Sequence, residues 1–143
     1  MIPSGLQGGD QFRLLFVSST SGEATSADIN LYNNLIQLSS GAGHQDLRPY
    51  YNQFRALIST ARNGDTAPVN ARDNTSTTGT GVPIYWVNAA KVADDYTDFY
   101  DGTWDSNAAT LASGSRTTTV TRVWTGSASN GTSTAPTAPL KKA

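Results

Sequence analysis

The chain contains no cysteine, so disulfide bonds, zinc–thiolate centres and a cysteine nucleophile are all excluded. A single histidine, His44, argues against a zinc site built from several imidazoles. There is also no G-x-S-x-G motif, which would place a nucleophilic serine on a sharp turn. The sequence therefore predicts a protein that is not an enzyme.

Charge is also scarce: charged residues make up 15% of the chain against about 25% in typical domains, and the net charge is −1. The absence of a basic stripe argues against nucleic acid and anionic membranes as partners. No apolar run approaches the roughly 20 residues of a membrane span, and residues 1–9 do not resemble a signal peptide. The chain is instead rich in uncharged residues, chiefly serine, threonine, asparagine and glycine. Such a neutral, hydroxyl-rich composition is typical of extracellular modules, so we expect an extracellular or cell-surface location.

A chain of 143 residues is expected to form one domain. We expect a lead at 1–9, an α+β domain at 10–132 and a low-complexity tail at 133–143. Apolar and β-branched runs predict strands, and 3.6-residue periodicity predicts two helices. The expected strands are 12–17, 54–61, 82–88 and 117–126, and the expected helices are 28–41 and 92–102, with a shorter helical piece or turn near 45–53.

The first expected helix has clear end signals. Asp28 is a good N-cap, Gly41 is a good terminator, and His44 follows where an imidazole can cap carbonyl groups. Two long polar loops, 62–82 and 105–117, are expected to contact a ligand, because long loops in compact domains are usually functional.

The segment from Lys91 to Ser106 carries five of the eleven acidic residues. One interpretation is a helix with a wet acidic face, because Val92, Tyr96 and Phe99 share helical spacing. Another is a calcium site that uses Asp101, Asp105 and loop oxygens. A catalytic carboxylate pair is disfavoured, since its two groups must flank a substrate cleft.

Four residues are candidates for ligand contact: Arg72, Asp73, Asn74 and Trp104. Arg72 and Asp73 are adjacent in "NARDN", where they either pair with each other and pin the loop or contact a ligand. Trp104 lies in an expected loop and is a candidate platform for a sugar ring. Trp86 and Trp124 lie in expected strands and are assigned to the core.

Three segments together resemble a known family: "FRLLFVSSTS", "FRALIST" before an "ARD" loop, and "KVADDYTDFYDGTWD" followed by "VWTGSASNGT". They are similar to the C-type-lectin-like domains of the endostatin-like branch found in bacterial surface and secreted proteins. The resemblance covers about residues 10–132. It implies mixed short strands with two helices and long loops, in a non-enzymatic adhesion module that binds a glycan or protein ligand.

The chain departs from this family at its end. Such domains close with a terminal strand that pairs with the first one, whereas only "TSTAPTAPLKKA" follows Gly131 here. Pro136 and Pro139 argue against a central strand. A second hypothesis is therefore a subunit of a surface assembly, in which the tail of one copy completes the next and deletion of 134–143 abolishes oligomers. A hydrolase acting through His44 or Asp101 is the third hypothesis.

Overall fold

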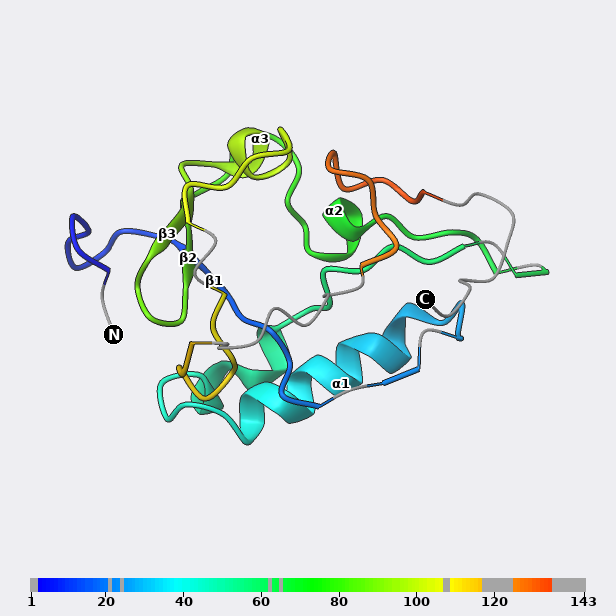
Figure 1. Ribbon diagram of the computed structural model, residues 1–143, viewed down its shortest axis with the longest axis horizontal. Coiled ribbons are helices and arrows are strands. Elements are labelled where there is room, and N and C mark those ends of the chain that lie inside the picture. Colours follow the sequence, from blue (N-terminus) through cyan, green and yellow to red (C-terminus); the bar gives the residue numbers. More distant parts are fainter. Residues whose placement is uncertain are drawn as a thin grey trace.

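The computed structural model describes residues 3–20, 22–23, 25–61, 63–64, 66–106, 109–116 and 125–134. Within these ranges the chain forms a small α+β fold, in which a three-stranded sheet lies beside α1 and a set of long connections (Figure 1). In chain order the elements are β1 (Arg13–Leu15), α1 (Ile29–Gly41), the 3-10 helix η1 (Arg48–Gln53), α2 (Ala71–Asn74), β2 (Ile84–Trp86), β3 (Lys91–Ala93) and α3 (Tyr96–Phe99).

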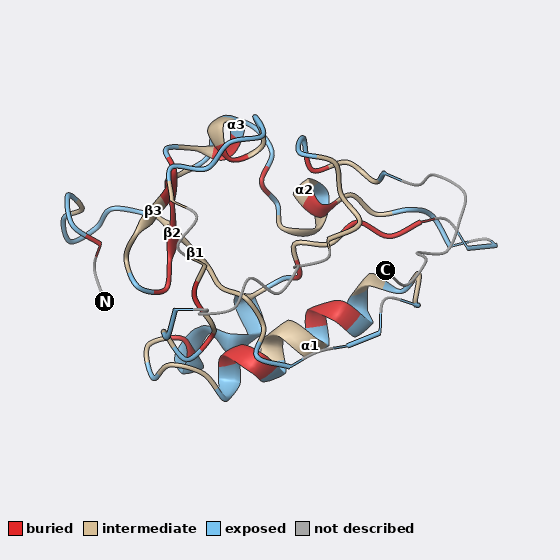
Figure 2. Cartoon of the chain, viewed as in Figure 1, coloured by how far each residue is buried: buried red, intermediate tan, exposed pale blue. Residues whose placement is uncertain are grey.

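The sheet has the order β1-β2-β3. β1 runs parallel to β2, with Arg13 opposite Ile84, and β2 runs antiparallel to β3. The strands expected at 12–17 and 82–88 are confirmed at their centres. β2 is buried along its whole length, as a strand with neighbours on both sides should be (Figure 2).

Helix α1 confirms the helix expected at 28–41. The side chain of Asp28 accepts a hydrogen bond from the backbone N–H of Asn30, at 2.9 Å, and satisfies one of the free amides of the first turn. His44 does not cap the other end. Its Nδ1 accepts from the N–H of Asp46 at 3.3 Å, and the last turn is closed instead by the N–H of Ala42, which donates to Leu38.

The strand expected at 54–61 is wrong. Within the described residues this segment carries one isolated bridge, from Thr60 to Val69, because the side chains of Asn33 and Asn74 take the backbone groups of Ala56. The N–H of Ala56 donates to Oδ1 of Asn33, and the hydroxyl of Ser59 accepts from the N–H of Ala71.

The helix expected at 92–102 is also wrong in its first half. Lys91–Ala93 forms β3, because a tight turn in which the N–H of Trp86 donates to Ala90 folds the chain back onto β2. Asp95 then begins α3 as an N-cap, its carboxylate accepting from the N–H groups of Thr97 and Asp98. The capping residue has extended backbone angles, so no helix can continue through it from Val92.

Two apolar clusters hold the sheet. The larger joins Ile84, Trp86, Val92, Tyr96 and Phe99, with Leu15, Val17 and Leu57 packed against it. The smaller joins Leu47, Val87 and Ala112, with Leu14, Phe16 and Phe54 packed against it. Because the side chains of successive strand residues point to opposite faces, Leu14 packs against the smaller cluster and Leu15 against the larger one.

Parts of the expected organisation lie outside the described residues. Positions 117–124 of the fourth expected strand, with Trp124, and positions 135–143 of the tail are not among them. In the part of the chain that is described, no helix has the length and apolar character needed to cross a lipid bilayer.

Candidate functional site

Trp104 is the most exposed tryptophan among the described residues, at 38%. It is not a free platform on both sides, because one face stacks on Phe99 with ring centres 5.2 Å apart and planes at 13°. Its edge meets Trp86 at 5.9 Å, and its Nε1–H donates to the carbonyl of Phe99 at 3.1 Å. These contacts hold the indole in one orientation and leave part of its surface open.

Trp104 lines a hollow of about 350 Å³, here called the Trp104 hollow. Its lining residues include Trp104, Phe99 and Tyr100, the apolar Leu57 and Ala71, and Ser127 and Ser129 from the turn after "VWTG". An aromatic surface faced by hydroxyl and backbone groups is a chemically mixed lining that suits a small polar ligand with an apolar side.

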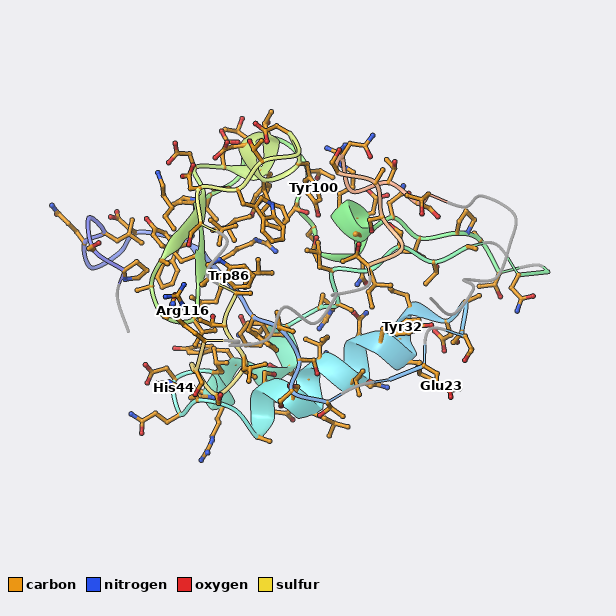
Figure 3. The ribbon with its side chains drawn as sticks, viewed as in Figure 1. Glu23, Tyr32, His44, Trp86, Tyr100 and Arg116 are labelled. Carbon is orange, nitrogen blue, oxygen red and sulfur yellow. The ribbon has the colours of Figure 1, made fainter. Side chains whose placement is uncertain are left out.

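Tyr100, which borders this hollow, is held from several directions. Its hydroxyl lies 3.0 Å from the hydroxyl of Thr77, and the guanidinium of Arg72 lies over its ring, 5.7 Å from the centre. Gly131 passes so close that a Cβ there would lie 2.5 Å from the ring. Figure 3 shows Tyr100 between α3 and α2, so the ring links the two short helices.

Arg72 and Asp73 are not paired with each other, because each has a different partner. Arg72 lies against Tyr100, while Asp73 accepts a hydrogen bond from the side-chain amide of Asn70 at 2.8 Å. Arg72 is therefore brought near the Trp104 hollow through Tyr100, and Asp73 stays exposed at the N-terminal turn of α2.

Asn74 has an internal role. Its Nδ2 donates to Oδ1 of Asn33 at 2.9 Å and to the carbonyl of Ala56 at 2.7 Å, and its Oδ1 accepts from Nδ2 of Asn33 at 3.0 Å. Both amide hydrogens and the oxygen are thus used within the fold. The expected ligand loop 62–82 is consequently anchored by α2 rather than open along its whole length.

The acidic segment gathers Asp94, Asp98 and Asp105, each of which offers a carboxylate oxygen within 4.8 Å of the others. Lys91 supplies the positive charge, with Nζ at 2.5 Å from Asp94 and 3.3 Å from Asp105. Both contacts raise the pKa of Lys91, and the bond to Asp94 has the larger effect. Calcium prefers six to eight oxygen ligands. In this group, the ammonium of Lys91 already forms ion pairs with two of the three carboxylates.

Asp101, the other half of the expected calcium pair, is not part of this group of carboxylates. Its Oδ1 accepts from the backbone N–H of Thr103 at 2.7 Å and from the hydroxyl of Thr103 at 2.9 Å. Both hydrogen bonds lower the pKa of Asp101, and the bond from the backbone N–H has the larger effect. The structure thus separates Asp101 from Asp105 and joins Asp105 to Lys91.

A larger hollow of about 1020 Å³ includes residues of the first strand in its lining and is here called the β1 groove. Its walls include Phe12 to Leu15, Phe54 and Leu57.

Comparisons of the chain with protein-family models, with curated proteins and with solved structures found no match.

Proposed function

We propose that this chain is an extracellular, C-type-lectin-like binding or adhesion module without enzymatic activity, and that its ligand is a carbohydrate. The resemblance of three sequence segments supports the fold assignment. The observation that carries the proposal is the Trp104 hollow, where a half-exposed indole lies beside serine hydroxyls and backbone groups.

The hollow suits a sugar ring for two reasons. A pyranose has an apolar face of C–H groups, which packs on the open surface of Trp104, while its hydroxyls reach the exposed Ser129. The volume of about 350 Å³ lies at the small end of the range of about 300–1,000 Å³ typical of ligand pockets. The ligand would therefore be held by one terminal sugar unit.

The test is a glycan array followed by calorimetry on the best glycan. Trp104→Ala should abolish binding, and Ser129→Leu should do the same by filling the hollow while the indole stays stacked on Phe99. Tyr50→Ala is the matched control, because it removes a 56% exposed aromatic ring from η1, outside the hollow. Undiminished glycan binding by both hollow variants, with unchanged melting midpoints, would reject the proposal.

A second candidate function, a subunit of a surface assembly completed by a strand from a neighbouring chain, is favoured by a different observation. Among the strands that the structure describes, β1 lies at an edge of the sheet, with β2 on its one paired side. Open sheet edges of this kind accept added strands. Light scattering on the purified chain tests it: concentration-dependent oligomers support it, and a monomer at every concentration up to the millimolar range opposes it.

A further inference from the structure

The sequence contains two Asn–Gly pairs, Asn63–Gly64 and Asn130–Gly131, and both lie within the described residues. Such a pair can modify itself without an enzyme, because the backbone nitrogen of the glycine can attack the side-chain amide carbon of the asparagine. Glycine favours the attack, since it has no Cβ to obstruct the approach and its backbone adopts the necessary angles easily. The attack needs a glycine N–H that water can deprotonate and an asparagine side chain that is free to turn. The fold decides whether each pair meets these two conditions.

At Asn130 the fold opposes the reaction through three hydrogen bonds. The N–H of Gly131 donates to the carbonyl of Ala128 at 2.9 Å, so it is shielded from deprotonation by water. The Oδ1 of Asn130 accepts from the backbone N–H of Thr132 at 3.1 Å and from the hydroxyl of Thr132 at 2.7 Å. These two bonds hold the side chain against the rotation that would bring its amide carbon into line with the nitrogen.

The packing of Gly131 adds a further restraint. This glycine is buried and has a φ of +76°, and a Cβ here would lie 2.5 Å from the ring of Tyr100. Its carbonyl also accepts from the N–H of Arg72 at 3.3 Å. Ring closure moves the peptide between Asn130 and Gly131, so these contacts would be disturbed as well. The reaction at Asn130 therefore requires local opening of the chain around Tyr100.

The surroundings of Asn63 are different, because Asn63 and Gly64 are both exposed. Asn63 and Thr66 exchange both backbone hydrogen bonds, at 3.2 and 3.0 Å, and thereby close a tight turn. In such a turn the peptide after the first residue directs its N–H away from the hairpin, which places the N–H of Gly64 toward solvent. In Figure 1 the described chain before α2 reaches the end of the molecule farthest from the sheet. Both conditions for the attack are therefore met at this pair.

We infer that Asn63 is a site of spontaneous deamidation, which the folded protein converts to aspartate and isoaspartate, while the fold protects Asn130. Water takes the proton from the nitrogen of Gly64, and this nitrogen then forms a bond to Cγ of Asn63. The bond from Cγ to Nδ2 breaks, and Nδ2 leaves as ammonia with a proton from water. A second water opens the resulting five-membered succinimide at either of its two carbonyls. In the balance one water is consumed and one ammonia is released, with no oxidation or reduction.

The modification changes both the charge and the backbone of the turn. Each product carries a carboxylate that is ionised at neutral pH, where asparagine is uncharged. Isoaspartate also adds a methylene to the main chain, and the carbonyl of Asn63 that accepts from Thr66 becomes part of a free carboxylate. The turn is then no longer closed in the same way. The change falls in the loop 62–82, which the sequence predicts to contact a ligand, and not in the Trp104 hollow.

The test follows both pairs in one sample of the full chain. The protein is incubated at mildly alkaline pH, with and without guanidinium chloride, and then digested with pepsin at acidic pH, which stops the reaction. Mass spectrometry measures the gain of one mass unit at each site. In the folded chain Asn130 should react at least about tenfold more slowly than Asn63, because its hydrogen bonds must open first. In guanidinium chloride the two sites should react at similar rates.

Two further measurements make the test specific to the mechanism. Gly64→Ala should slow the reaction at Asn63 several-fold, because the added Cβ obstructs the attack, and should leave Asn130 unchanged. Hydroxylamine cleaves at the succinimide, so without denaturant it should cut the chain after residue 63 and not after residue 130. No mass gain at Asn63 over a period in which the unfolded chain reacts, or equal rates at Asn63 and Asn130 in the folded chain, would overturn the inference. An unchanged rate in Gly64→Ala would also overturn it.

Discussion

The side-chain amides of Asn33 and Asn74 bond each other in both directions, Nδ2 of each donating to Oδ1 of the other at 3.0 and 2.9 Å. The pair joins α1 to α2, and it also ties down the segment at Ala56, whose N–H donates to Asn33 and whose carbonyl accepts from Asn74. One polar contact therefore connects three parts of the chain that share no sheet.

Asn74→Ala should lower the free energy of unfolding by about 2 to 3 kcal/mol, because it leaves the Nδ2 group of the buried Asn33 and the carbonyl of Ala56 without the partners that Asn74 provides. Urea unfolding at neutral pH measures the change. Asn34→Ala, at an exposed position of α1, should stay within about 0.5 kcal/mol of the parent. A double variant at 33 and 74 should cost less than the sum of the single changes, and strict additivity would contradict the coupling.

Gly81 and Gly79 offer a comparison of crowding at similar backbone angles. Both have positive φ, +75° and +78°, but a Cβ at Gly81 would lie 2.2 Å from the ring of Tyr96, while nothing lies within 4 Å at Gly79. Gly79→Ala should cost about 1 kcal/mol from the left-handed backbone alone. Gly81→Ala should cost about 3 kcal/mol or more, because the Tyr96 ring must also move. Equal thermal shifts for the two variants would show that the ring can move away freely.

The low pKa of Asp101 makes a prediction about acid stability. The N–H and the hydroxyl of Thr103 lower the pKa of this carboxylate below its ordinary value of 3.8. The pKa of Asp101 is lower in the folded state than in the unfolded state. Ionised Asp101 therefore stabilises the fold fully above the unfolded pKa, and this stabilisation is lost as the pH falls through the folded pKa. Asp101→Asn should therefore flatten the loss of stability that urea melts show below about pH 4. A carboxyl NMR titration that places the pKa of Asp101 at or above 3.8 would refute the assignment.

Calcium should leave the melting midpoint of the parent chain unchanged, because Lys91 already supplies a positive charge to the cluster of Asp94, Asp98 and Asp105. Lys91→Met keeps an unbranched side chain of similar length but removes the charge, so three carboxylates would repel one another. In that variant millimolar calcium should raise the midpoint above its value in EDTA, by mass action on the folded state. A rise of several degrees in the parent chain would show instead that the carboxylates bind calcium despite Lys91.

The elements that sequence reasoning predicted well have local signals. Helix α1 combines an N-cap at Asp28 with a 3.6-residue apolar period, and β1 and β2 are short apolar runs. The segment 92–102 was harder, because Val92 fits both a helical face and a strand. The signal that separates the two is Asp95, followed three residues later by Asp98, which marks the beginning of a helix at that point.

The strand expected at 54–61 could not be corrected from local sequence. Its backbone bonds to an amide at Asn33 and to the carbonyl of Thr125, both distant along the chain. The candidate site shows the same limitation. Trp104 was a visible candidate, but Tyr100 and Ser129 reach its hollow from separate turns. Nothing in the local pattern indicates that Lys91, rather than a metal ion, would neutralise the acidic group.

The parallel pairing of Arg13 with Ile84 has a consequence for how the chain folds as it is made. β1 leaves the ribosome first, but its partner follows some seventy residues later, roughly 4 to 14 seconds at 5–20 residues per second. During that interval both edges of β1 and the apolar side chains from Phe12 to Val17 lack their final neighbours. The sheet therefore forms late, by closure of a long loop, and the apolar side chains of β1 stay exposed to other nascent chains until β2 arrives.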